Sequence, residues 1–163
     1  DGNQEYLRFN VATTFTRAAE ESLIDVGSSL HIGARGPTND GSVFNHTREV
    51  GYGLINGSEL FKTGLNNTAK RVVESLKGRS VYLCFDMDFF DPSCAPGVCT
   101  PTWGGPTSRE GLEFLQNLAG LNLVGADINT VSPPHDISGM TAFLAATVGL
   151  EILTLFCHSK NLI

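Results

Sequence analysis

The sequence has few charged side chains and no cluster of basic ones. Charged residues make up 17% of the 163 positions, with 11 Lys and Arg against 17 Asp and Glu, and the formal net charge is −6. A phosphate backbone is bound through clustered positive charge, which this chain lacks. We therefore expect no nucleic-acid partner.

Segments that would direct the chain into or across a membrane are also missing. No stretch combines a basic start, an apolar middle and a small-residue cleavage site, so we expect no signal peptide. The longest apolar stretch, residues 140–157, is interrupted at Thr141, Thr147, Gly149, Glu151 and Thr154. Such a stretch predicts a buried helix rather than a bilayer span, so we expect no membrane partner.

Cysteine is scarce and is never spaced as Cys-x-x-Cys. Of the four cysteines, Cys84 and Cys157 lie inside apolar runs, where buried free thiols are typical. Free thiols are compatible with a reducing cytosol, so we expect a cytoplasmic location. For Cys94 and Cys99, which lie on either side of a Pro-Gly pair, a local disulfide is the alternative.

The pattern of apolar residues predicts alternating helices and strands. Strands are expected at residues 30–35, 52–55, 80–86 and 121–127, and helices at residues 12–24, 42–50, 67–77, 107–118 and 139–156. Thr107 and Glu110 match a capping box at the start of one helix, Ser42 is expected to cap another, and Asn56-Gly57 is interpreted as a turn. The alternation indicates an α/β fold with a doubly wound, mostly parallel sheet flanked by helices.

Acidic residues stand where the two apolar strands end. Asp86 and Asp88 are spaced i, i+2, so in an extended chain their carboxylates point the same way, and Asp127 ends the other strand. Neighbouring carboxylates repel unless they are protonated or joined by a cation. Oxygen ligands suit Mg, Ca or Mn, and mixtures with imidazole suit Mn, Ni, Zn or Fe. The alternative is that these aspartates only cap loops.

A longer pattern surrounds this pair. It reads Asp-Met-Asp-Phe-Phe-Asp-Pro at 86–92, Ala-Pro-Gly at 95–97, Thr-Pro at 100–101 and Gly-Gly at 104–105. Upstream segments 13–20 and 32–36 and downstream segments 125–127, 131–136 and 138–142 extend it. Over almost its whole length the chain resembles the ureohydrolase (arginase/agmatinase) superfamily, in its agmatinase-like branch.

The resemblance implies an arginase-like fold, with residues 1–163 as the C-terminal part of a single α/β domain. It implies hydrolysis of a small guanidino compound to urea and an amine with two divalent metal ions, manganese first and nickel as the alternative. Asp86 would bridge the ions and Asp88 would bind one of them. Asp127 would be an outer-shell carboxylate that holds the metal ligands or the loop. A homo-oligomer, trimer or hexamer, is implied as well.

Part of the family's metal site is absent from this sequence. The family's Gly-Gly-Asp-His and Asp-x-His-x-Asp stretches do not occur, and Asp86 with Asp88 alone cannot close a dinuclear site. Catalytic residues therefore stay unassigned. None of the four histidines replaces the missing ligands, and His135 is expected near the site only as a residue that orders its loop.

The substrate region also departs from the family pattern. Val11 stands where the family has a proton-shuttling histidine, and Thr130 where it has a glutamate that pairs with the guanidinium. Candidate substrate-binding residues are Thr100, Trp103, Asn129 and Thr130. Three interpretations stay open: an enzyme for an altered substrate such as guanidine or a biguanide, a catalytically inactive subunit that supports a related active partner in a hetero-oligomer, and a generic α/β domain binding one Mg ion.

Overall fold

The computed structural model describes residues 8–37 and 43–162. The described residues fall into two compact units, one within Asp1–Ile32 and Pro37–Ile55 and the other within Gly33–Gly36 and Asn56–Ile163. All of the predicted metal-site and pocket residues lie in the second unit.

The first unit contains short helices and a two-stranded sheet. Its elements are η1 (Val11–Thr13), α2 (Thr14–Glu20), η2 (Val26–Ser28), most of β1 (Leu30–Ala34), α3 (Val43–Val50) and most of β2 (Gly53–Asn56). The helix predicted at 12–24 was too long, because Ser22 adopts a positive φ of 55° that is incompatible with a continuing helix. The predicted cap Ser42 lies outside the described residues.

A pair of parallel strands lies at the centre of the second unit. Strand β3 (Ser80–Asp86) pairs with β4 (Asn122–Asn129), with Cys84 opposite Asp127 and Asp86 opposite Asn129. Because side chains alternate along a strand, Cys84, Asp86, Asp127 and Asn129 share one face of this sheet. The opposite face carries apolar side chains, which include the buried Phe85.

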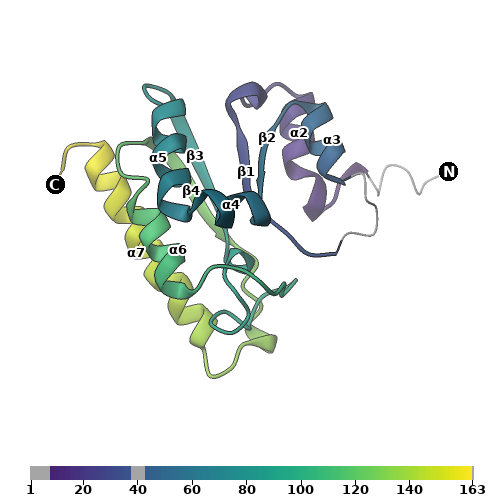
Figure 1. Cartoon of the computed structure of the whole chain (residues 1–163), viewed down its shortest axis with the longest axis vertical. Coiled ribbons are helices and arrows are strands. Elements are labelled where there is room, and N and C mark those ends of the chain that lie inside the picture. The colour runs from purple at the N-terminus through teal and green to yellow at the C-terminus, as the bar shows by residue number, and fades with distance from the viewer. Residues whose placement is uncertain (1–7, 38–42, 163) are drawn as a thin grey trace. The chain divides into compact units, whose positions relative to one another are not determined.

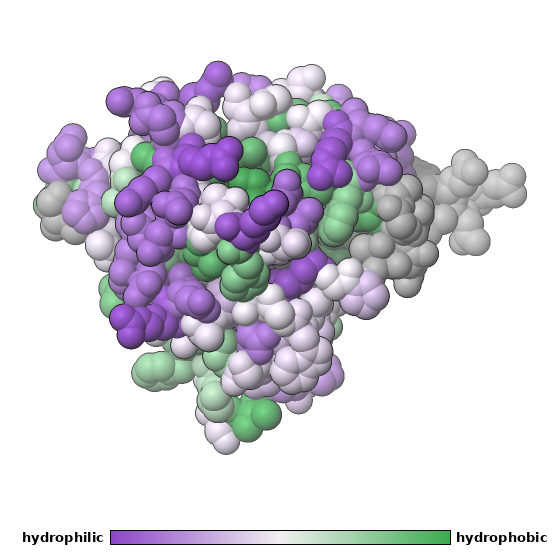
Figure 2. Space-filling model, in the orientation of Figure 1, coloured by the Kyte–Doolittle hydropathy of each residue, from purple (hydrophilic) through white to green (hydrophobic). Residues whose placement is uncertain are grey.

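Helices cover the apolar face. Helix α7 (Met140–Ser159) runs along β4, α6 (Ser108–Gln116) packs on α7, and α5 (Leu65–Ser75) packs on α6, as Figure 1 shows. The core between them includes Leu115, Leu123 and Val148, none of which is exposed. Hydrophilic side chains cover much of the region of α5 and α6 in Figure 2.

One helix was missed by the sequence analysis. Asn56-Gly57, interpreted as a turn, begins α4 (Gly57–Thr63). The Asn56 side chain accepts a hydrogen bond from the Glu59 backbone N–H, and the Glu59 carboxylate accepts one from the Asn56 backbone N–H. The capping box predicted at the start of α6 is present, with Glu110 bonded to the Thr107 backbone and hydroxyl. The same chemistry begins both helices.

The outer face of α7 is exposed rather than buried. Phe143, Leu150 and Leu153 have exposed fractions of 79%, 64% and 62%, and only 22% of the helix's apolar window is buried. The prediction of a buried helix was therefore wrong for this face. Helix α7 is long and apolar enough to cross a membrane. Core helices of soluble proteins share this length and composition, so these two properties are weak evidence of a membrane span.

Candidate metal centre

Asp86 is the last residue of β3, and its carboxylate lies on the open face of the sheet. The protein atoms around it reduce its solvation and raise the pKa of its carboxyl, and the negative charges of Asp88 and Asp127 raise that pKa further. In the part of the chain described here, no side chain or amide donates a recorded hydrogen bond to this carboxylate. Asp86 is exposed, so water can solvate its carboxylate, and within the described residues no recorded hydrogen bond from the protein occupies it.

Asp88 lies one turn further along, in the short 3₁₀ helix η3 (Met87–Phe89). The chain is therefore not extended between the two aspartates, and the i, i+2 argument gave the wrong reason for placing them together. They are neighbours because η3 buries Met87 completely and leaves Asp88 half-buried beside the end of β3. Their electrostatic interaction raises the pKa of Asp86.

Three side chains from separate segments hold Asp88. The Thr100 hydroxyl donates to Oδ2 of Asp88 at 2.6 Å. The Asp88 backbone N–H donates to the Thr130 hydroxyl oxygen at 3.3 Å, and Nη2 of Arg35 donates to the Asp88 carbonyl at 2.6 Å. Two of the predicted pocket residues, Thr100 and Thr130, therefore contact a predicted metal ligand.

Arg35 was not singled out from the sequence. Besides Asp88, its Nη2 donates to the carbonyls of Phe90 at 3.0 Å and Thr102 at 2.9 Å. Burial lowers the pKa of the guanidinium, while the nearby charges of Asp88 and Asp91 act to raise it. A Cβ at Gly105 would lie 2.5 Å from Nη2 of Arg35 and 2.7 Å from the backbone nitrogen of Asp91 and the backbone oxygen of Phe89, so this position requires glycine.

Asp91 organises the rest of the loop. Its carboxylate accepts hydrogen bonds from the backbone N–H groups of Ser93 at 3.0 Å, Gly104 at 2.8 Å and Gly105 at 3.2 Å. Hydrogen bonds from Ser93, and then from Gly104 and Gly105, lower the pKa of Asp91 to about 2. Its bonding is satisfied by the loop, which distinguishes it from Asp86.

Asp127 belongs to a polar network on the same face as Asp86. The Tyr82 hydroxyl donates to Asp127 at 2.6 Å, and the Asn129 amide donates both to Asp127 and to the Cys84 sulfur. Burial, followed by the bond to Asp127, raises the pKa of Cys84 to about 12. Cys84 therefore stays a thiol, and the chemistry of this face is that of oxygen ligands.

Within the described residues, the other predicted residues make no recorded hydrogen bond to the carboxylates of Asp86 or Asp88, although Asn129 lies opposite Asp86 in the sheet. Nδ1 of His135 pairs with the Ser132 hydroxyl at 2.7 Å, which is consistent with a role in ordering its loop. Trp103 is 75% exposed in the glycine-rich loop. Asn129 is exposed at the end of β4, and its recorded bonds are to Asp127 and Cys84.

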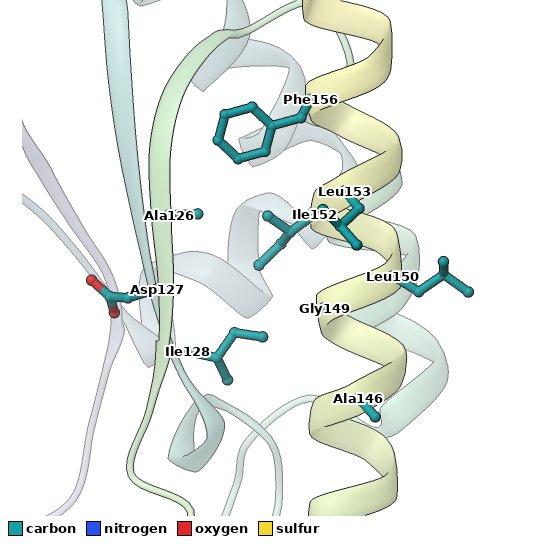
Figure 3. Close-up of a pocket in the computed structure, with 9 residues that line it drawn as sticks. All are labelled: Ala126, Asp127, Ile128, Ala146, Gly149, Leu150, Ile152, Leu153 and Phe156. Carbon is teal, nitrogen blue, oxygen red and sulfur yellow. The ribbon is translucent and has the colours of Figure 1, made fainter.

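A groove lies on the opposite face of β4. It has a volume of about 610 Å³ and is lined by Asp127, six aliphatic side chains, Gly149 and Phe156 (Figure 3). In Figure 3 the Asp127 carboxylate points away from α7, whereas Ile128 points toward it. The groove is therefore apolar, and it is not lined by Asp86 or Asp88.

Comparison with known proteins matches residues 1–154 to the model of the Arginase family. The chain belongs to the arginase family. This confirms the ureohydrolase assignment made from the aspartate-rich pattern. The structure has the arginase-like fold, with helices flanking parallel strands, in part of such a domain.

Individual relatives agree with this assignment to the arginase family. Guanidinobutyrase of Pseudomonas aeruginosa is 38% identical over 86% of this chain and 44% of its own length. Agmatinase of Neisseria meningitidis serogroup C is 34% identical over 99% of this chain and 49% of its own. Proclavaminate amidino hydrolase from Streptomyces clavuligerus superposes with a TM-score of 0.87 at 34% identity, covering 93% of this chain and 50% of that one. The chain thus spans about half the length of the relatives it matches.

The donor set in this arginase-family chain suits hard divalent cations but is incomplete. Asp86 and Asp88 offer carboxylate oxygens beside a third carboxylate, an arrangement that a cation would stabilise. Within residues 8–37 and 43–162, however, no group of three or more His, Cys, Asp or Glu side chains could hold a metal ion. The two aspartates could hold metal only together with ligands from elsewhere.

Proposed function

We propose that the full-length protein hydrolyses a guanidino compound to urea and an amine, with two divalent metal ions, manganese or nickel, held in part by Asp86 and Asp88. The observation that carries this proposal is the aspartate pair itself. One member, Asp86, has no recorded hydrogen-bond donor among the described residues, and the other, Asp88, is fixed by three side chains.

The metal ions would supply a reactive water near neutral pH and would stabilise charge as the C–N bond breaks. The chain's own contribution is to position the ligands. The Thr100 hydroxyl bonds to Oδ2 of Asp88, which leaves the other oxygen and a further lone pair of the carboxylate for a cation. Asp127 and Asn129, joined by a hydrogen bond, lie on the face from which a substrate would approach Asp86.

The residue at position 130 is a threonine, so it offers no carboxylate to pair with a guanidinium. The Thr130 hydroxyl already donates to the Asn129 carbonyl at 2.7 Å and accepts from the Asp88 N–H. Trp103 offers an exposed aromatic face on which a planar cation could stack. Guanidine or a biguanide would suit a site without this carboxylate, whereas relatives are named for guanidinobutyrate and agmatine.

Urea release by the full-length protein tests this proposal. The protein is loaded with Mn²⁺ or Ni²⁺ and offered guanidine, a biguanide, guanidinobutyrate and agmatine. D86N and D88N should each lower turnover by at least about 100-fold, since metal catalysis fails without its ligands. E74Q removes an exposed carboxylate on α5 and serves as the matched control. Urea release that survives both aspartate substitutions would contradict the proposal.

One observation favours a second function, that of a catalytically inactive subunit supporting an active partner. The described residues provide two ligands where two metal ions need more. This alternative predicts that the protein by itself binds no manganese or nickel and releases no urea from any of the four compounds. It also predicts a hetero-oligomer with a related, metal-loaded subunit.

A further inference from the structure

Asp88 is fixed at its backbone nitrogen, its backbone oxygen and its side chain. The three partners are Thr130, Arg35 and Thr100, which are separated from Asp88 by 42, 53 and 12 positions in the sequence. A residue held at all three groups keeps one backbone position and a restricted side-chain rotamer. Only one carboxylate oxygen, Oδ1, has no recorded partner among the described residues.

We propose that Thr130, Arg35 and Thr100 are positioning residues that pre-orient the Asp88 carboxylate for a divalent cation. This inference rests on the metal site of the proposed function, but it does not depend on which substrate is hydrolysed. Residues that hydrogen-bond to a metal ligand set its orientation, and their loss typically weakens metal binding about 10- to 100-fold.

The backbone at Thr130 carries the first argument. Thr130 has a φ of 68°, a left-handed conformation that β-branched residues rarely adopt. Such a conformation persists where its surroundings impose it. Here the Thr130 carbonyl accepts from Cys99 N–H at 3.0 Å, Val98 and Val131 form a β-bridge, and the Thr130 hydroxyl is thereby presented to Asp88.

The environment of Arg35 carries the second argument. Its guanidinium bonds to backbone carbonyls rather than to a carboxylate, and its Nε is buried with no recorded hydrogen bond. The single nitrogen Nη2 contacts the carbonyls of Asp88, Phe90 and Thr102, so it holds both ends of the loop that contains Asp88 and Thr100. A lysine keeps the charge, but it presents a compact, strongly hydrated ammonium on a flexible stem in place of the planar guanidinium that occupies this site.

Thr100 supplies the third contact, and its role can be distinguished from substrate binding. Its hydroxyl is bonded to Asp88 at 2.6 Å. A positioning role predicts that T100V weakens Mn²⁺ binding about 10- to 100-fold, whereas T100S, which keeps the hydroxyl, binds Mn²⁺ like the wild type. If T100V raises KM for substrate while the Mn²⁺ dissociation constant stays unchanged, Thr100 is a substrate contact and its part of the proposal is wrong.

The decisive experiment uses position 130, because glycine there separates metal positioning from stability. T130G removes the hydroxyl but also removes the strain of a positive φ, which glycine adopts freely. In the metal-free full-length protein we expect an unchanged or higher Tm, together with Mn²⁺ binding about 10- to 100-fold weaker by calorimetry. T130S should bind Mn²⁺ like the wild type.

Control variants remove similar groups at a distance from Asp88. T147V deletes a hydroxyl that bonds the Phe143 carbonyl on α7, and R109K alters an arginine paired with Glu113 on α6. Both should leave the Mn²⁺ dissociation constant unchanged, whereas R35K should raise it about 10- to 100-fold.

Exchange of the Asp88 amide provides a readout that needs neither metal nor activity. In the metal-free protein, T130G should accelerate hydrogen exchange at the Asp88 N–H, because the hydroxyl that accepts it is gone. Wild-type Mn²⁺ affinity in T130G, or a loss of affinity that only parallels a fall in Tm, would overturn the proposal. Absence of urea release with these metal effects intact would instead count against the proposed hydrolysis alone.

Discussion

The Tyr82 hydroxyl donates a hydrogen bond across the sheet to the Asp127 carboxylate at 2.6 Å. The Tyr82 ring lies over Gly125, where an added Cβ would come within 2.7 Å of it. The absence of a Cβ at Gly125 thus leaves room for the Tyr82 ring, whose hydroxyl reaches Asp127. This contact fixes a carboxylate whose charge raises the pKa of Asp86.

Replacement of Asp127 should be detectable at Tyr82. The hydrogen bond to Asp127, aided by its charge, raises the pKa of Tyr82. In D127N the tyrosine should therefore ionise at lower pH than in the wild-type protein. An NMR titration of tyrosine ring carbons measures this, with Tyr52 as the internal reference. An unchanged Tyr82 titration would mean that the contact does not persist in solution.

Replacement of Gly125 should destabilise the second unit. The Cβ in G125A would displace the Tyr82 ring, and overpacking of this kind typically costs about 1–3 kcal/mol. Urea unfolding of the full-length protein measures the loss. The double variant Y82A/G125A should cost less than the sum of its single substitutions, because the clash is removed together with the ring. Additive losses would contradict this explanation.

The loop around Asp91 should loosen in acid. Because its folded pKa of about 2 lies below the ordinary aspartate value of about 3.9, the carboxylate stabilises the folded loop fully above the ordinary value. That contribution is lost as pH falls through the window between the two values. Hydrogen exchange at the Gly104 amide, corrected for its intrinsic pH dependence, should show protection falling over this window. D91N should show low protection at every pH.

The cap of α4 should contribute measurably to stability. In N56A the Glu59 N–H loses its acceptor, and such a loss typically costs about 0.5–2 kcal/mol. Thermal unfolding checks the value, and T107A provides a matched loss at the capping box of α6. If N56A were neutral while T107A destabilised the protein, the Asn56 cap would not stabilise α4 in solution.

Local chemistry explains what could be predicted from the sequence. The apolar run at 80–86 gave the bounds of β3, and the Thr107–Glu110 pair gave the start of α6, because each signal lies within a few residues. Asn56-Gly57 was misread because the residue types that form turns also cap helices. Only the Glu three residues later distinguishes the two.

Contacts between distant segments could not be predicted. Arg35 bonds to Asp88, which is 53 positions away in the sequence, and Asp91 bonds to Gly104, which is 13 positions away. No local sequence pattern therefore marks either pair. Thr130 was predicted as a pocket residue from the pattern, but its contact with Asp88 depends on a positive φ that residue type does not indicate. The outer face of α7 was misjudged because composition alone does not tell which face is covered.

Metal analysis of the purified full-length protein tests the central claim most directly. The wild type, D86N, D88N and the control E74Q are each saturated with Mn²⁺ or Ni²⁺, freed of excess ion and measured by mass spectrometry. We predict about two bound ions per chain in the wild type and in E74Q, and fewer than one in D86N and D88N. Equal metal content in all four proteins would contradict the assignment of Asp86 and Asp88 as metal ligands.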